Sequence, residues 1–304
     1  MNGIICIDKP QGFTSFDVIG KLRGILKLRR LGHSGTLDPM ATGVLPVFVG
    51  FATKACGILP DDRKTYIADF RLGQVSDTQD STGTVLEEHD ASHITEEMLR
   101  AALPQFIGDI AQIPPMYSAV SVDGKRLYEL ARQGKTVERQ ARQVHVEQIE
   151  LTAFDAQQGT GTLTIHCGTG VYVRTILHDL GQALGCGAVM TGLRRTMSNG
   201  LPIEKCFTFE QIQQLAAENR LAEAVIPIEE VFSSLPAIRL NAKQTVHYRN
   251  GVKLGLSQLK NQLTDAEQYA VFGEPDGFLG TALADRTENC LRVERNLCEP
   301  KQQA

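Results

Sequence analysis

The sequence Gly32-His-Ser-Gly-Thr-Leu-Asp-Pro-Met-Ala-Thr-Gly-Val-Leu-Pro46 is a polar, glycine-rich stretch that leads into the apolar run 44–49. Its one carboxylate, Asp38, precedes Pro39. Because a proline ring disfavours helical backbone in the residue before it, Asp38 is predicted to have extended backbone and a fixed direction. The glycines allow tight folding or the close approach of a ligand. Taken alone, an Asp-Pro pair is more often an ordinary turn capped by the aspartate, so the length of the pattern has to decide.

Four further motifs stand in order along the chain. They are Lys9-Pro10 with Gly12-Phe-Thr-Ser15, Lys64-Thr-Tyr66, Gly170-Val-Tyr-Val-Arg-Thr175 and Leu193-Arg-Arg195. Together with the loop 32–46 they resemble the TruB family, the tRNA pseudouridine synthases that isomerise uridine 55 in the T loop. A chance match of five ordered motifs over roughly two thirds of the chain is far less plausible than a match of one. The resemblance therefore identifies the chain as a member of that family.

The composition bounds the kind of partner that the protein takes. With 304 residues the chain is long enough for one substantial core and a small second domain. A net charge of −4 and a pI near 6.0 argue against a surface that coats nucleic acid indiscriminately, so an RNA site should be a local basic patch. No apolar run reaches the length of a membrane span, and the first residues lack the basic region of a signal peptide. We expect a cytoplasmic monomer with no membrane contact.

Cysteine and histidine spacing gives no sign of a metal site. The seven cysteines form no Cys-x-x-Cys pair, and their odd number fits reduced thiols used as small hydrophobic residues. The seven histidines show no His-x-x-x-His spacing, and His166 and Cys167, adjacent in a predicted strand, would point to opposite faces. We expect no metal and no cofactor.

Hydrophobic periodicity places the motifs on elements. The run 4–7 and the stretches 44–49 and 64–72 are predicted strands, and Tyr66 starts a row of alternating apolar residues in the last of them. Ser15 is predicted to cap a helix that carries five cations between residues 21 and 30 with no acid nearby, which is typical either of a solvated face or of phosphate contact. A second helix is predicted from Thr95 to about Phe106, with Met98 on its apolar side.

The segment from Ile113 to Val144 is basic in a chain that is acidic overall. It holds six cations against three acids, so six minus three leaves +3. Asp123-Gly124 is a turn signal inside it, and Tyr117 and Tyr128 offer ring faces on which bases stack. Solvated charge is the alternative interpretation. The segment resembles the thumb insertion with which the family closes over its RNA stem-loop.

A strand with a bulge is predicted where the pairs Val144/Val146 and Ile149/Leu151 fall out of phase by one residue. The following Gly168-Thr-Gly170 and helix lack the third glycine of a dinucleotide-binding fingerprint, because Val173 stands in its place, and we reject that reading. Arg174 falls in the first turn of the helix, where a cation opposes the helix dipole and a carboxylate partner would resolve the conflict. The resemblance supplies Asp38 as that partner.

The resulting fold class is α+β. A pseudouridine synthase catalytic domain, residues 1–232, is expected to hold a mixed, mostly antiparallel sheet flanked by helices, with the thumb-like insertion at about 113–143. Short strands and turns after residue 233 are typical of a small β-barrel. The resemblance makes residues 233–304 a PUA-like RNA-binding domain.

The resemblance also assigns roles to residues. It makes Asp38, Tyr66 and Arg174 catalytic: the carboxylate, a ring against the target base and possible base, and the salt-bridge partner. An arginine beside Asp38 should lower its pKa further below the ordinary aspartate value and orient it. Leu193 would belong to the pocket floor, Lys9 and Pro10 would brace the loop, and His33 would contact the T loop while the target uridine is flipped out. The substrate-binding set is His33, Tyr172, Leu193, Lys9, Pro10 and Asp80, and the RNA-binding patch is Lys125, Arg126, Arg132 and Arg195.

Three other functions fit parts of the sequence. One is a guide-RNA-dependent pseudouridine synthase, and a second is a non-catalytic RNA-binding or tRNA-folding module, which is compatible with catalysis in the same chain. The third is a hydrolase that uses Asp38 with His33 and Ser34, which needs a second base or a metal that the sequence does not offer. The sequence leaves open whether Asp38 attacks uracil C6 or ribose C1′.

Overall fold

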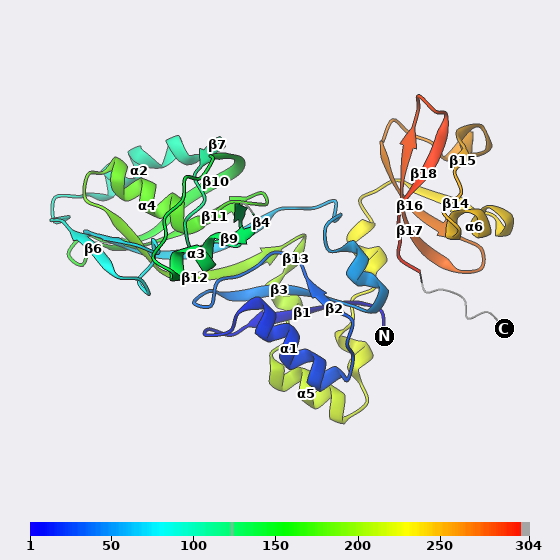
Figure 1. Ribbon diagram of the computed structural model, residues 1–304, viewed down its shortest axis with the longest axis horizontal. Helices are drawn as coiled ribbons and strands as arrows, with labels where there is room; N and C mark the ends of the chain where they lie inside the picture. Colours follow the sequence, from blue (N-terminus) through cyan, green and yellow to red (C-terminus); the bar gives the residue numbers. More distant parts are fainter. Residues whose placement is uncertain (123, 299–304) are drawn as a thin grey trace.

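The computed structural model describes residues 1–122 and 124–298, so that Asp123 of the expected turn lies outside the described residues. Among these residues, nine strands join in one sheet (Figure 1). The strands are β1 (Gly3–Lys9), β2 (Leu31–His33), β3 (Thr42–Val49), β4 (Lys64–Leu72), β7 (Gly108–Gln112), β10 (Arg142–Asp155), β11 (Thr160–Cys167), β12 (Ala188–Ser198) and β13 (Leu201–Pro202).

The sheet order is β1-β3-β12-β4-β11-β10-β7, with β2 on β3 and β13 on β12. The β12–β3 pair is parallel and the other pairs are antiparallel, which confirms the mixed, mostly antiparallel sheet. β4 occupies the predicted stretch 64–72 and alternates as a half-buried strand should, with Tyr66, Ala68 and Phe70 on the core side. The predicted bulge in β10 appears as a register shift between Val146 and Gln148.

Helices pack on two separate parts of this sheet. α2 (Glu96–Ala102) and α4 (Val173–Ala183) share a core with β4, β10 and β11, whereas α1 (Ser15–Leu26) and α5 (Phe209–Ala217) share a core with β1 and β3 (Figure 1). The shorter elements are β5 (Gln74–Ser76), β6 (Val85–Glu88), β8 (Ser121–Val122), β9 (Lys125–Arg126), α3 (Leu127–Arg132), and the 3-10 helices η1 (Gly50–Ala55), η2 (Leu103–Phe106), η3 (Ile203–Lys205), η4 (Leu221–Ala224), η5 (Ile228–Phe232) and η6 (Leu256–Gln262).

Two local predictions are wrong. Thr14, not Ser15, caps α1: its hydroxyl accepts from the Asp17 N–H, and Asp17 bonds back in a capping box, which leaves Ser15 as the first helical residue. Met98 does not join the apolar stripe of α2. Met98 is 40% exposed, and Leu99 is the buried residue of that helix.

A second, five-stranded sheet follows η5. Its strands, in spatial order, are β14 (Ala237–Leu240), β16 (Gln268–Gly273), β17 (Gly277–Asp285), β18 (Cys290–Asn296) and β15 (Leu254–Gly255). The helix α6 (Ala242–Arg249) packs on this sheet. This sheet is compatible with the small β-barrel expected for the tail, and β14 and β15 were not predicted. Phe232 stacks on Phe278 with ring centroids 5.7 Å apart, and this contact joins the two sheets through a shared apolar cluster.

Candidate active site

Lys9, at the end of β1, supports the loop that carries Asp38. The Lys9 side chain is fully buried, and its ammonium donates to the carbonyls of Pro10, Phe13 and Pro39. Burial lowers the pKa of Lys9 to about 8, while the Asp38 charge opposes this shift. The Gly12 N–H also bonds the Pro39 carbonyl, at 2.8 Å. Lys9 therefore lies under the loop, where the sequence placed a bracing residue.

Ser15 is a second support that the sequence did not reveal. Its buried hydroxyl accepts from the Leu37 N–H at 2.8 Å and donates to the Leu37 carbonyl at 3.2 Å. The residue before Asp38 is thus held at both of its backbone polar groups, and this agrees with the fixed direction that Pro39 predicts. A sequence offers no sign of such a contact, because a serine one position after a helix cap looks like the cap itself.

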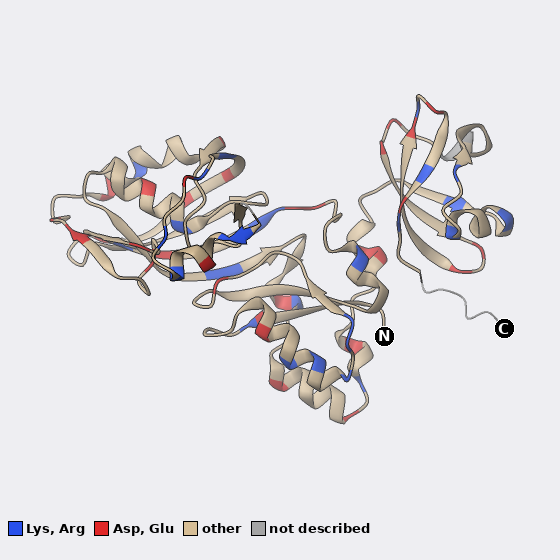
Figure 2. Cartoon of the chain, in the orientation of Figure 1, with Lys and Arg blue, Asp and Glu red and all other residues tan. Residues whose placement is uncertain are grey.

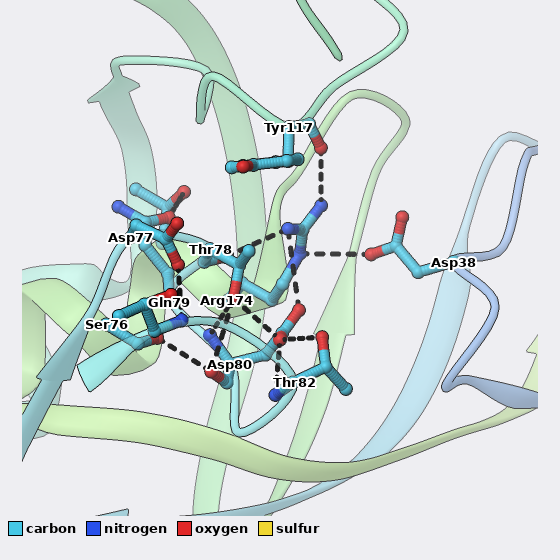
Figure 3. A network of polar contacts seen from close by, with 11 residues as sticks. Asp38, Ser76, Asp77, Thr78, Gln79, Asp80, Thr82, Tyr117 and Arg174 are labelled. Atoms are coloured by element: carbon cyan, nitrogen blue, oxygen red, sulfur yellow. Dashed lines mark hydrogen bonds and ion pairs between the residues drawn. The ribbon is translucent and has the colours of Figure 1, made fainter. Parts of the chain in front are cut away.

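Asp38 and Arg174 form an ion pair across the site (Figure 3). Arg174 Nε lies 3.0 Å from Asp38 Oδ2. The guanidinium is almost buried, with 6% of the side chain exposed, and it donates to the Thr78 and Tyr117 carbonyls at 3.0 Å each. Because all three nitrogen atoms of the guanidinium make contacts, the guanidinium has one orientation. The Asp38 carboxylate that faces it is oriented in the same way.

Asp80 is the second acid on the same guanidinium. Its Oδ2 lies 3.6 Å from Arg174 Nη1, and its Oδ1 accepts from the hydroxyls of Thr78 and Thr82 and from the Thr82 N–H (Figure 3). Asp80 is buried behind Arg174, away from the cavity. Asp80 therefore holds Arg174 in place, whereas the resemblance had assigned Asp80 to the substrate-binding set.

The pKa of Asp38 shifts in the direction opposite to the sequence-based expectation. Burial is the largest influence and raises the pKa of Asp38, the Arg174 charge lowers it, and the Asp80 charge raises it, with a net upward shift. The carboxylate faces the cavity and its side chain is 37% exposed, but the surrounding protein removes enough water to outweigh the arginine. The expectation failed because it counted the arginine and not the loss of solvent.

A cavity of about 250 Å³ opens beside this ion pair. It is lined by Asp38, Tyr66, Tyr172, Arg174 and Leu193, which the sequence had singled out, and also by Lys64 and Ser118. Tyr172 is held in place by Gln112 of β7, whose side chain bonds both its N–H and its carbonyl. Three separate motifs of the sequence therefore meet at one cavity with the loop.

Tyr66 enters the cavity from the core face of β4. Its side chain is 7% exposed, and burial raises the pKa of the Tyr66 phenol, while the Arg195 charge opposes the shift. The phenol is thus neutral at ordinary pH in the unliganded protein. Lys64, two residues earlier on the same face, bonds the Asp62 carbonyl at 2.7 Å, and burial followed by the Arg195 charge lowers its pKa.

Lys64 and Ser118 are cavity residues to which the sequence gave no role. Lys64 belongs to the Lys-x-Tyr motif, and the period of two along β4 places it on the face of Tyr66. That period was a usable signal. Ser118 lies in the basic segment, and its buried hydroxyl has no hydrogen-bond partner among the described residues. Nothing in the local sequence marks it.

His33 lies outside the cavity, and Arg195 lies in its wall. His33, on β2, is half-buried and does not line the cavity, and burial lowers its pKa. Arg195 was placed in an RNA-binding patch, and that placement is wrong: the side chain is fully buried in the wall of the cavity. Of two adjacent arginines on a strand only one faces the core, and here Arg194 takes the surface and pairs with Asp8.

The other patch residues are exposed on the basic segment. Lys125 and Arg126 form β9, and Arg132 ends α3, where its guanidinium lies 5.5 Å from the centre of the Tyr128 ring. Figure 2 shows cations on α3 and along α1. The Arg126 guanidinium bonds the Ala119 carbonyl. Lys125 and Arg132 make no ion pair within residues 1–122 and 124–298.

The described part of the chain contains no group of three or more His, Cys, Asp or Glu residues arranged to hold a metal ion. A search of its helices likewise finds none with the length and hydropathy needed to span a membrane.

Comparison with known proteins places this site in a family. Residues 23–173 match the model of the TruB family pseudouridylate synthase N-terminal domain, and residues 174–233 match the tRNA pseudouridylate synthase B C-terminal domain. The tRNA pseudouridine synthase B of Pasteurella multocida is 40% identical over 97% of this chain and 95% of its own length. The enzyme of the same name from Clostridium perfringens is 38% identical over 98% of this chain and 100% of its own length.

A solved structure shows the same fold. The crystal structure of a Cbf5-Nop10-Gar1 complex contains a chain that superposes with a TM-score of 0.75 at 24% identity, over 97% of this chain and 85% of the other. At this identity the likeness speaks for the architecture alone. The two family models, the two relatives and the site geometry agree, and the chain belongs to the TruB family of pseudouridylate synthases.

Proposed function

We propose that the protein isomerises uridine 55 in the T loop of tRNA to pseudouridine, with Asp38 as the catalytic carboxylate. The observation that carries this proposal is the Asp38–Arg174 ion pair at the wall of a cavity of about 250 Å³. The relatives named tRNA pseudouridine synthase B support the substrate class. The chain thereby acts on tRNA as an isomerase that moves uracil from an N1 link to a C5 link.

The residues around the cavity have distinct parts in this reaction. Asp38 acts as an anion, whether at uracil C6 or at ribose C1′, and Arg174 keeps that anion charged and aimed although burial favours the neutral acid. Tyr66 lies against the base, and its phenolate form, present once the phenol has given its proton to water, accepts the proton from C5. Leu193 and Tyr172 enclose the detached uracil, so that it turns without escaping.

Substrate RNA is bound outside the cavity by separate surfaces. The target uridine has to leave the base stack to reach Asp38. The basic segment 113–143 closes over the stem-loop through Lys125, Arg126 and Arg132, and it is tied to the site because Arg174 bonds the Tyr117 carbonyl. His33 contacts the T loop from β2.

The catalytic domain is 1–232, and 233–304 is a PUA-like domain that binds the tRNA further along. The protein acts as a cytoplasmic monomer without metal or guide RNA.

Release of tritium from RNA labelled at uridine C5 tests this proposal. A synthetic T stem-loop of tRNA, with the label at position 55 only, should lose tritium when incubated with the purified protein alone. A matched stem-loop with cytidine at position 55 should bind and remain unchanged. Release only after a guide RNA is added would point to a guided enzyme. Binding without release would point to a non-catalytic module, and release of fragments would point to a hydrolase.

A further inference from the structure

Arg195 stands at the junction of the two halves of the site. On β12 its backbone is the register partner of Tyr66 on β4 and of Gly43 on β3. The approach to Gly43 is so close that a Cβ there would lie 2.1 Å from the Arg195 carbonyl oxygen. One residue thus adjoins both the strand that carries Tyr66 and the end of the loop that carries Asp38.

The Arg195 side chain reaches under that loop. Its Nε donates to the Val44 carbonyl at 2.8 Å, and its Nη2 donates to the Gly35 carbonyl at 2.9 Å. These two acceptors lie on opposite sides of Asp38 in the sequence. A planar guanidinium fixes the directions of both bonds at once, so it clamps the loop at both of its ends.

The charge of Arg195 is not matched by an acid. The side chain is fully buried, it takes part in no ion pair in the described part of the chain, and its Nη1 has no hydrogen-bond partner there. A buried cation without a carboxylate destabilises a fold. Its charge contributes to lowering the pKa of Lys64 and of His33, and it opposes the rise in the pKa of Tyr66. A buried charge without a partner is typical of a functional site, so the electric field of Arg195 points to a role in the site.

We propose that Arg195 is a positioning residue of the isomerisation, which clamps the Asp38 loop onto the Tyr66 strand and holds the Tyr66 hydroxyl in a positive field. This inference rests on the proposed function for the reaction, but its contacts belong to the free protein. Arg195 lies in the wall of the cavity but is fully buried, so in the free protein its contacts are with the Asp38 loop and not with solvent. It acts through the two groups that do the chemistry.

The test compares Arg195→Met and Arg195→Lys with Arg194→Met as the matched control. The neighbouring arginine pairs with Asp8 and lies outside the cavity. At saturating stem-loop, Arg195→Met should lower the rate of tritium release by roughly 10- to 100-fold, as expected for a displaced catalytic group. Affinity for the stem-loop should change less than about twofold, because no phosphate contact is lost. Arg195→Lys keeps the charge and should recover part of the rate, and Arg194→Met should stay near the wild-type rate.

The same substitution in a Tyr66→Phe background separates positioning from general damage. If Arg195 acts partly through the Tyr66 hydroxyl, Arg195→Met should cost less there than in the wild type. An equal cost in both backgrounds, or a loss confined to affinity, would overturn the proposal. Ultraviolet titration of the phenol, taken as the difference between each protein and its Tyr66→Phe form, needs no substrate. It should show a higher Tyr66 pKa in Arg195→Met, and an unchanged value would refute the field even if the wild type proved inactive on tRNA.

Discussion

The charges of Arg174 and, more weakly, of Lys9 favour the ionised form of Asp38, whereas the loss of solvent and the charge of Asp80 oppose it. A carboxylate whose pKa is raised keeps its proton at a pH where an exposed aspartate has lost it. The proposed reaction needs the ionised form of Asp38. The activity should therefore respond to changes in this balance that leave the shape of the site intact.

Asp80→Asn tests the balance through pH. Because the pKa of Asp38 is raised, the bound-state rate should fall as pH drops through that raised value, earlier than for an exposed aspartate. Removing the Asp80 charge should lower the pKa of Asp38 and move this acid limb to lower pH, even if the maximal rate also falls. The amide still accepts from Thr78 and Thr82. Asp77→Asn is the matched control and should leave the limb in place; a limb that moves to higher pH in Asp80→Asn would contradict the account.

Arg174→Ala should lose both activity and stability. The side chain is 6% exposed, and its removal takes the neighbouring positive charge from the buried Asp80 and the arginine donor from the carbonyls of Thr78 and Tyr117. Breaking a buried pair costs about 3 to 5 kcal/mol, and we expect about 3 because Asp38 retains 37% of its side-chain exposure. Urea unfolding measures this loss. Wild-type stability together with lost activity would mean that the network serves chemistry alone.

At the scale of elements, the sequence predicts what local patterns determine. β4 and the bulge in β10 follow from a period of two and a break in it, and the helix after Gly170 follows from its apolar spacing. The candidate site was found through motif resemblance, which brought Asp38, Arg174, Tyr66, Tyr172 and Leu193 to one cavity. Burial was not predictable in the same way. Which of Arg194 and Arg195 turns inward depends on pairing between β12 and strands far away in sequence.

The basic segment allows a prediction about RNA binding. Lys125→Gln with Arg132→Gln removes two exposed cations but spares Arg126, whose guanidinium is bonded to Ala119. Stem-loop affinity should fall, and its dependence on salt should weaken by about one unit of slope per lost phosphate contact. The bound-state rate should stay close to wild type. Arg100→Gln with Arg220→Gln removes cations already in ion pairs and is the control; equal slopes in both double variants would mean that the segment faces solvent.

At the scale of the whole molecule, the two sheets are not independent. One apolar cluster takes Ile4 and Phe48 from the large sheet and Ala270 from the small one, with Phe232 between them. Lys54 of η1 also bonds the Asn296 carbonyl at the end of β18, at 3.0 Å. The tail should therefore hold a defined position relative to the cavity, as the RNA-binding role proposed for residues 233–304 requires.

Phe232→Ala tests this coupling. The ring is fully buried and stacks on Phe278, so truncation should lower the free energy of unfolding by about 3 kcal/mol or more. Activity on full-length tRNA should fall more than activity on the isolated stem-loop. Phe16→Ala, whose ring is 67% exposed, is the control and should stay near wild-type stability. A loss of less than about 1 kcal/mol for Phe232→Ala would mean that the cluster does not join the sheets.

The central claim is that the Asp38 carboxylate carries the chemistry, and Asp38→Asn tests it most directly. The amide has nearly the same shape, so the loop and RNA docking should survive, but it has no negative charge. With C5 tritium release and stem-loop affinity measured side by side, turnover should fall about 10⁴-fold or more while affinity changes little. A variant that keeps more than about a tenth of the wild-type rate, a barrier increase below ~1.4 kcal/mol, would contradict the account.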